Sequence, residues 1–212
     1  MYQLYYYPNN ASLAPHMLLE EIGAPFKLEL VDRTQQAHKS ANYLRLNPSG
    51  RIPVLVDGDL VIFEAAAICL YLAEQHPEAN LLPAIGTPQR AHTLQWLMYL
   101  TNTLQTELLT YFYPERWTTD QAALEQVRVK AEERIGEMLD LLGAQLADGR
   151  SWFIGEQYTL VDAYLGMLCR WTRNLNRPAR DLPQLAPYLQ RLLARPAVQR
   201  ALKSEGLTEP WV

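Results

Sequence analysis

The spacing of apolar residues in the first third of the chain predicts alternating strands and helices. Residues 3–7 and 26–30 are short runs of aromatic and aliphatic side chains, typical of strands. Between them, residues 12–22 predict a helix in which Leu18 and Ile22 share one face. A strand, a helix and a strand with short links form a βαβ unit, so we expect a parallel pair of strands with a right-handed crossover.

A β-hairpin is the next predicted element. Residues 54–56 and 60–62 are both aliphatic. Asp57 and Gly58 lie between these runs and tolerate the positive φ angles of a tight turn. Pro53 stands at the mouth of the hairpin, where it cannot donate a ladder hydrogen bond. The simplest interpretation is an edge strand that a proline opens.

The peptide bond between Ile52 and Pro53 has two forms, trans and cis, which differ by only about 0.5–1 kcal/mol. A cis bond would turn the Ile52 main chain outward, with its N–H and its C=O both unpaired. Such a donor and acceptor pair can bind an extended peptide by strand addition. The hairpin mouth is therefore a candidate ligand site as well as a candidate edge strand.

Two helical segments flank the hairpin, at residues 41–46 and 64–73. Glu64 begins the second segment, where a carboxylate suits the helix dipole but could also receive the ammonium group of a ligand. The order of elements, βαβ-α-ββα, matches a thioredoxin-like domain, although other small α/β folds share this order.

The rest of the chain predicts only helices. Residues 77–88 hold three prolines and a glycine without periodicity, which is typical of a linker. Apolar residues then recur at helical spacing in five segments, at 89–111, 119–146, 160–174, 184–193 and 196–203. Thr159 and Asp162 have the spacing of a capping pair at a helix start. We predict an α/β plus all-α chain, with a thioredoxin-like domain at 1–78, a linker at 79–88 and a helical-bundle domain at 89–212.

Composition and charge argue against several classes of function. With 212 residues the chain can hold one large domain or two small ones. Its formal net charge is −4 and its isoelectric point is near 5.6, without a basic cluster, so we expect no nucleic-acid partner. No apolar run approaches the roughly 18 residues that span a membrane, and the N-terminus lacks the features of a signal peptide.

Cysteines and histidines are few and scattered. Cys69 and Cys169 lie in apolar helical contexts far apart in the sequence. We expect them to be core thiols rather than a disulfide, which fits a reducing cytoplasm. The four histidines share no ligand spacing, so we expect no metal site.

One stretch of the chain resembles the N-terminal domain of the cytosolic glutathione transferases. The likeness lies in Asn47 and Pro48, the segment GRIPVL at residues 50–55, Glu64 and the segment AICLYL at residues 67–72. A small α/β domain followed by a helical domain is also that family's architecture, so the resemblance covers the whole chain. It implies a homodimer and glutathione as the co-substrate.

The resemblance implies a glutathione-binding site in the first domain. In the family, a cis proline, the residue before it and a glutamate hold the cysteinyl and γ-glutamyl parts of glutathione, and these roles fall to Pro53, Ile52 and Glu64. Lys39 and Arg51 resemble positions that hold the glycyl carboxylate. Ala65 replaces the family's usual serine, and losing that charge-assisted hydrogen bond, about 1.5–3 kcal/mol, predicts weaker binding.

The family's reacting group lies between the first strand and the first helix. This stretch is similar to the bacterial beta class but has Ala11 where that class has a cysteine, so we expect no redox chemistry through an enzyme thiol. Theta-like and tau-like members use a serine in this place, and we predict that Ser12 stabilises the glutathione thiolate. Ser12 could instead only cap the helix. Asn10 and Tyr6 are the alternative donors.

We expect the acceptor site among the helices of the second domain. Four aromatic residues could line an apolar pocket there: Tyr111, Tyr113, Trp117 and Trp171. Gln105 stands where beta-class relatives have a pocket histidine, whereas Tyr164 is more typical of a core.

We predict a cytoplasmic glutathione transferase of the detoxification type, which activates the glutathione thiolate for attack on a small apolar electrophile. One alternative is glutathione-dependent reduction of disulfides or peroxides, with thiolates that come only from glutathione. Another is a non-catalytic binding module with the same fold. Ala11 and Ala65 favour that module, whereas Ile52, Pro53, Glu64 and Ser12 oppose it.

Overall fold

The computed structural model describes all 212 residues and divides into two compact units. The first unit contains Met1–Pro83 and Leu193–Glu209, and the second contains Ala84–Leu192 and Pro210–Val212. This division differs from the predicted segments 1–78, 79–88 and 89–212, because the last helix groups with the first unit.

A four-stranded mixed sheet forms the centre of the first unit. Its strands are β1 (Tyr2–Tyr6), β2 (Phe26–Leu30), β3 (Val54–Asp57) and β4 (Leu60–Phe63), in the spatial order β2-β1-β3-β4. β1 and β2 run parallel, as the βαβ pattern predicts, and the other two pairs are antiparallel. Leu4 is fully buried at the middle of the sheet, opposite Leu28 on one side and Leu55 on the other. The predicted thioredoxin-like arrangement is confirmed.

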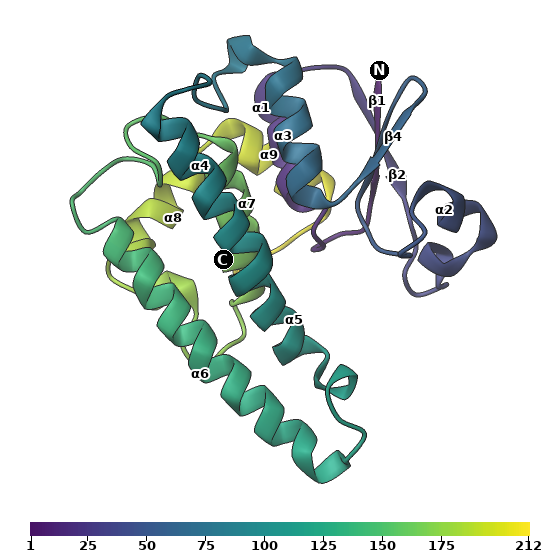
Figure 1. Ribbon diagram of the computed structural model, residues 1–212, viewed down its shortest axis with the longest axis vertical. Coiled ribbons are helices and arrows are strands. Elements are labelled where there is room, and N and C mark those ends of the chain that lie inside the picture. Colours follow the sequence, from purple (N-terminus) through teal and green to yellow (C-terminus); the bar gives the residue numbers. More distant parts are fainter. The chain divides into compact units, whose positions relative to one another are not determined.

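Helices cover both faces of this sheet. They are α1 (Leu13–Ile22), α2 (Ala41–Leu46) and α3 (Ala65–Gln75). α1 and α3 pack side by side on one face, and α2 lies on the other side of the strands (Figure 1). Two short 3₁₀ turns, Ala37–Lys39 and Pro77–Ala79, complete the connections.

The helix α9 (Pro196–Ser204) packs against α1, although almost the whole chain separates them. Arg195 donates two hydrogen bonds to the Glu21 carboxylate, at 2.6 and 2.7 Å. Arg200 pairs with Glu20 at 2.6 Å. These contacts explain why α9 belongs to the first unit rather than to the helical segment where the sequence pattern placed it.

The hairpin turn lies one residue later than predicted. Asp57 pairs with Leu60, so Gly58 and Asp59 are the two central turn residues, and Gly58 has a φ of 58°. Asp57 stays in β3, where its carboxylate accepts a 2.7 Å hydrogen bond from the Tyr71 hydroxyl.

The second unit is helical. Its main elements are α4 (Pro88–Tyr99), α5 (Gln105–Phe112), α6 (Gln121–Gln145), α7 (Leu160–Trp171) and α8 (Leu185–Leu193). α6 lies alongside α5 (Figure 1), and α7 is buried along its whole length.

The single helix predicted at 89–111 is interrupted by a π turn at Leu100–Leu104. This turn inserts a wider hydrogen-bond ring, in which the Gln105 N–H donates to the Leu100 carbonyl. Leu100 and Leu104, at the two ends of this turn, are both fully buried. π turns are frequent at functional sites.

The predicted capping pair at the start of α7 is confirmed. The Thr159 N–H donates to the Asp162 carboxylate at 2.7 Å, and the Thr159 hydroxyl accepts from the first turn of the helix. Asp162 also accepts from the Phe153 N–H at 2.8 Å and from the Tyr188 hydroxyl at 2.9 Å. Burial raises the Asp162 pKa to about 6, while these hydrogen bonds oppose the shift.

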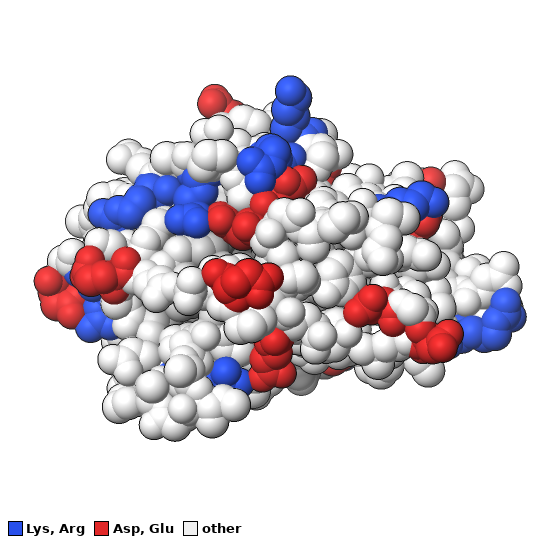
Figure 2. Space-filling model, turned by 90° about the horizontal axis from the view of Figure 1, so that it is seen from above, with Lys and Arg blue, Asp and Glu red and all other residues white.

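No helix of the protein combines the length and the apolar composition that a membrane crossing requires. Acidic and basic side chains are interspersed over the face shown in Figure 2, among a larger area of other residues.

Candidate active site

The loop before β3 holds the Ile52 main chain in a fixed and unpaired state. The Ile52–Pro53 bond is cis, as the resemblance implies. The Arg51 carbonyl accepts hydrogen bonds from Asn47 Nδ2 at 2.8 Å and from the Tyr43 hydroxyl at 2.7 Å. The Ile52 N–H and C=O have no hydrogen-bond partner within the chain. This loop therefore presents a donor and an acceptor to an extended ligand.

Asn47 and Tyr43 were not among the predicted site residues, although they fix this loop. The buried Asn47 also accepts from the Ser49 N–H at 3.0 Å and from the Ser49 hydroxyl at 2.7 Å. An asparagine that bonds the main chain two residues ahead is a local turn device, and this signal was readable in the sequence NPSGR.

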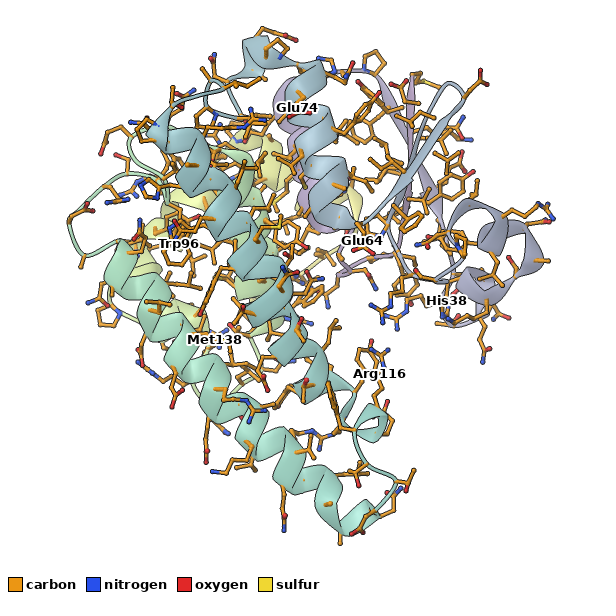
Figure 3. All side chains as sticks on the ribbon, in the orientation of Figure 1. His38, Glu64, Glu74, Trp96, Arg116 and Met138 are labelled. Atoms are coloured by element: carbon orange, nitrogen blue, oxygen red, sulfur yellow. The ribbon has the colours of Figure 1, made fainter.

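Glu64 occupies an unusual main-chain conformation directly before α3, at φ 74° and ψ 112°. A residue other than glycine in such a region costs about 1–3 kcal/mol, which the surrounding structure must offset. The Glu64 carbonyl accepts from the Ile68 N–H at 2.9 Å, while its side chain is exposed and caps nothing (Figure 3). The amides of Ala65 and Ala66, in the first helical turn, lack intrahelical partners. A carboxylate and unpaired amides thus stand together at this helix start.

Two predicted cations approach the same loop. Gly50 has a φ of 61°, and a β-carbon added to it would lie 2.8 Å from Lys39 Nζ. The Lys39 ammonium therefore lies against the chain immediately before Arg51. Both side chains are exposed and neither joins an ion pair.

His38 lies beside this pair and has a buried Nδ1 without a hydrogen-bond partner (Figure 3). Burial, followed by the charges of Arg33 and Lys39, lowers its pKa below the ordinary histidine value. His38 is therefore neutral at pH 7, and the positive charge beside it comes from Arg33 and Lys39.

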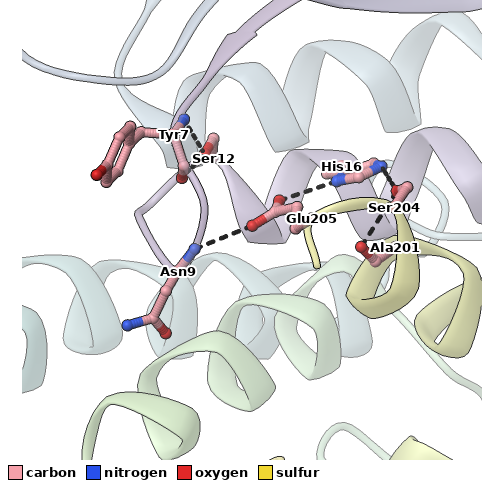
Figure 4. Close-up of polar contacts among 7 residues, drawn as sticks. All are labelled: Tyr7, Asn9, Ser12, His16, Ala201, Ser204 and Glu205. Carbon is pink, nitrogen blue, oxygen red and sulfur yellow. Dashed lines mark hydrogen bonds and ion pairs between the residues drawn. The ribbon is translucent and has the colours of Figure 1, made fainter. Parts of the chain in front are cut away.

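In the loop between β1 and α1, the Ser12 hydroxyl bonds the main chain before the helix. The Ser12 hydroxyl is fully buried, donates to the Tyr7 carbonyl at 3.2 Å and accepts from the Tyr7 N–H at 3.4 Å (Figure 4). It makes no capping bond to α1. Ser12 therefore lies in the predicted loop, and its hydroxyl proton points to the main chain that directly follows β1.

Asn10 and Tyr6, the two alternative donors, keep free polar groups. Asn10 Oδ1 accepts from the Ala11 N–H at 2.8 Å, and its half-buried Nδ2 has no partner. Burial, with the nearby Glu205 carboxylate, raises the pKa of Tyr6, so its phenol stays protonated and able to donate.

The cysteines are buried, as the sequence predicts. Ala11 holds the loop position, and Cys69 and Cys169 are both fully buried. Burial raises the pKa of both thiols, that of Cys169 to about 12. Neither cysteine supplies a thiolate at neutral pH.

The second unit holds the predicted acceptor residues. Gln105, which follows the π turn, accepts a 2.5 Å hydrogen bond from the buried Tyr164 hydroxyl. Because Oε1 faces Tyr164, the Gln105 amide nitrogen is the end left to donate elsewhere. Tyr164 is in the core, as predicted.

The aromatic candidates differ in their surroundings. Phe112, which is not one of the four predicted pocket residues, stacks edge-on against Tyr111 at 5.4 Å and Trp171 at 6.3 Å, and so links two of them. Trp171 is buried, and its Nε1 lacks a hydrogen-bond partner. The Arg116 guanidinium carbon lies 4.1 Å from the centre of the Tyr113 ring. Trp117 is 64% exposed.

Known proteins resemble the chain along its whole length. The N-terminal domain model of glutathione S-transferases matches residues 1–74, and the C-terminal domain model matches residues 110–195. The chain is 32% identical over 207 residues to glutathione S-transferase GstA of Escherichia coli O157:H7, with 97% of this chain and 99% of the relative covered.

Two further relatives differ in what their names say. Disulfide-bond oxidoreductase YfcG of Escherichia coli is 28% identical, with 95% of this chain and 94% of the relative covered. A glutathione transferase homolog from Sulfitobacter, solved with bound glutathione, is 27% identical with a TM-score of 0.89, over 98% of this chain and 99% of the other. With both domain models matched, and a relative 32% identical over nearly its whole length, the chain belongs to the glutathione S-transferase family.

Proposed function

We propose that this protein binds glutathione on its first unit and stabilises the thiolate for attack on a small apolar electrophile. The observation that carries this proposal is the unpaired Ile52 main chain, which Asn47 and Tyr43 hold through the Arg51 carbonyl. A cysteinyl residue in extended conformation can complete both hydrogen bonds, in the manner of an added strand.

The ends of glutathione have matching groups on either side of this contact. Glu64 binds the γ-glutamyl ammonium, and the free amides of Ala65 and Ala66 bind the neighbouring carboxylate at the positive end of the α3 dipole. These amides replace part of what the family's usual serine hydroxyl supplies. Lys39 and Arg51 bind the glycyl carboxylate.

The start of α1 stabilises the sulfur. We assign the main role to Asn10 Nδ2, because Asn10 Nδ2 has no partner whereas the Ser12 hydroxyl already bonds Tyr7. Tyr6 is the reserve donor, and Ser12 supports the loop. A donor aimed at a developing thiolate lowers the pKa of the thiol, since it stabilises the charged form only.

In the reaction, the thiolate sulfur attacks the electrophilic carbon of an activated aryl halide or similar compound. A C–S bond forms, the carbon–halogen bond breaks, and the halide leaves with the electron pair. We propose that the acceptor contacts come from the second unit, from Gln105, Tyr111, Tyr113, Trp117 and Trp171.

Disulfide reduction is the second candidate function. Both cysteines are buried with raised thiol pKa values, so every thiolate must come from glutathione. One glutathione thiolate attacks the substrate disulfide and releases one thiolate, and a second glutathione attacks the mixed disulfide. The products are glutathione disulfide and two reduced thiols, which balances the two electrons. A relative named as a disulfide-bond oxidoreductase supports this candidate.

Calorimetric titration with glutathione, followed by two assays, tests the proposal. We expect submillimolar binding and faster turnover of an aryl halide than of hydroxyethyl disulfide. Faster turnover of the disulfide would favour the second candidate. Absence of binding would contradict both functions and favour a non-catalytic module.

We also propose that the protein works as a cytoplasmic homodimer. Apolar side chains are exposed on the edge strand β4, namely Leu60, Val61 and Phe63, and Met98 is exposed on α4. Light scattering at micromolar concentration should give twice the 24.3 kDa chain mass, and a stable monomer would contradict the proposal.

A further inference from the structure

A buried polar cluster in the first unit joins the end of α9 to the loop before α1. At its centre is Glu205, whose side chain is fully buried and uses both carboxylate oxygens. Oε2 accepts a 3.0 Å hydrogen bond from the Asn9 N–H, and Oε1 lies 2.9 Å from His16 Nδ1 (Figure 4). A buried carboxylate is costly unless it is paired and hydrogen-bonded, so this arrangement calls for an explanation.

His16 completes the cluster from α1. Its side chain is fully buried, and its Nε2 lies 3.1 Å from the Ser204 hydroxyl. That hydroxyl also lies 3.2 Å from the Ala201 carbonyl, so it can either donate to His16 or accept from it and donate to Ala201. Because a carboxylate oxygen only accepts, the tautomer of neutral His16 that bonds both partners carries its proton on Nδ1, donates to Glu205 Oε1 and accepts at Nε2 from the Ser204 hydroxyl.

The cluster ends on the loop that carries the proposed thiolate donors. Asn9 has a φ of 59°, a left-handed conformation that asparagine tolerates better than most residues. Asn9 directly precedes Asn10, whose carbonyl accepts from the Leu13 N–H at 3.0 Å as α1 begins. The Glu205 bond to Asn9 therefore fixes the chain from which the Asn10 side chain projects.

We propose that Glu205 is a positioning residue of the active site, which holds Asn9 and thereby keeps Asn10 and the start of α1 aimed at the glutathione sulfur. The inference rests on the proposed function of this loop. Glu205 itself is buried behind the loop and acts only through it.

Two features separate this role from ordinary packing between α1 and α9. Glu21–Arg195 and Glu20–Arg200 already join these helices near the other end of α1. The Glu205 cluster instead contacts the loop that carries Asn10, whose Nδ2 stays free. A displacement of about 1 Å at such a site can lower the rate 10²-fold, so a fixed loop has a catalytic effect that general packing lacks.

The test compares Glu205→Ala, Glu205→Gln and the matched control Glu21→Ala, which removes an ion pair between the same helices. The readouts are the pKa of bound glutathione's thiol, by thiolate absorbance, and amide hydrogen exchange of residues 7–14 without ligand. We expect Glu205→Ala to raise the thiol pKa by about one unit and to lower kcat/KM about tenfold near neutral pH. Amide hydrogen exchange of residues 7–14 should be faster in Glu205→Ala than in the wild-type protein.

Glu205→Gln should keep a thiol pKa near the wild-type value, because its amide oxygen can accept from Asn9 while its nitrogen donates to His16 Nδ1. If the Glu205→Ala protein does not fold, Glu205→Gln is the variant in which thiol pKa and loop exchange are measured. Glu21→Ala should lower stability while thiol pKa and loop exchange stay unchanged.

A Glu205→Ala protein with wild-type thiol pKa and loop exchange would overturn the inference. A Glu205→Gln protein with the same raised thiol pKa as Glu205→Ala would also overturn the inference. The rise in pKa would then come from the lost charge of Glu205 and not from a displaced loop. If the wild-type protein does not lower the pKa of glutathione's thiol, the proposed function fails, and loop exchange still shows separately whether Glu205 holds the loop.

Discussion

The starts of α1 and α7 are built in opposite ways, although a hydroxyl residue precedes each helix. At α7, the Thr159 hydroxyl accepts from the first helical turn, and Asp162 accepts from Thr159 in return. At α1, the Ser12 hydroxyl turns back to Tyr7 and makes no cap. The capping groups of α7 therefore bond one another, whereas the loop before α1 keeps the Asn10 side-chain donor available.

A buried carboxylate supports each helix start, and these carboxylates differ in the same way. Asp162 collects hydrogen bonds from Phe153, Thr159 and Tyr188, all of which are core groups. Glu205 joins the core residue His16 to Asn9, at the edge of an open loop. We infer that the Asp162 cluster serves stability alone, while the Glu205 cluster serves the position of reacting groups.

Asp162→Ala should have the largest effect on stability. It leaves several buried donors without an acceptor, and we expect a loss of about 3–5 kcal/mol in the free energy of unfolding. Urea unfolding measures this loss. The folded Asp162→Ala protein should bind glutathione with an unchanged thiol pKa. A changed thiol pKa would contradict the proposal that the Asp162 cluster serves stability alone.

The effect of Asp162→Ala should also depend on pH. Burial raises the pKa of Asp162 in the folded state to about 6, above its value in the unfolded chain. The folded state then binds the proton more tightly, so the stability that Asp162 contributes falls as pH rises from about 4 to about 6. The difference between wild type and Asp162→Ala should be larger at pH 4 than at pH 7. The opposite trend would show that the hydrogen bonds outweigh burial.

Asn10→Ala should have the largest effect on catalysis. We expect kcat to fall about 10–100-fold, because one donor to the sulfur is lost, with little change in unfolding free energy. Ser12→Ala should lower kcat less, since its hydroxyl supports the loop only. Steady-state kinetics and urea unfolding of both variants measure this contrast, and the reverse ranking would return the catalytic role to Ser12.

Glu64→Gln should raise the KM for glutathione about tenfold with a smaller change in kcat, because the ammonium contact is equal in the ground and transition states. Asp59→Asn is the control, since it removes one exposed carboxylate from the turn of the same unit. Equal KM values in the two variants would contradict the role of Glu64.

Thr159→Ala should have the smallest effect, about 1 kcal/mol of stability, because it removes only the cap hydroxyl and leaves the Asp162 carboxylate in place. A thermal or urea unfolding curve is sufficient to measure it.

Local features of this protein could be predicted from the sequence. The cap of α7, the hairpin and the βαβ unit depend on residues a few positions apart, and all three are present. The π turn escaped prediction because apolar spacing continues through it, although residues 101–103 are poor helix formers.

Features that depend on distant contacts or on side-chain direction could not be predicted. His16 and Glu205 are 189 positions apart, and no local pattern announces their pairing. Ser12 has the residue type and position of a thiolate donor, yet its rotamer points to Tyr7. Sequence specifies which groups enter a loop, whereas the packing around the loop decides which of them remain free.

The most direct test of this account is the pKa of the glutathione thiol in its complex with the wild-type, Asn10→Ala and Ser12→Ala proteins, measured by absorbance titration of the thiolate. We expect a wild-type value well below the roughly 8.5 of an ordinary thiol. We also expect a rise toward that value in Asn10→Ala and a value close to wild type in Ser12→Ala. An unchanged pKa in Asn10→Ala, with a raised one in Ser12→Ala, would contradict the open helix start described here.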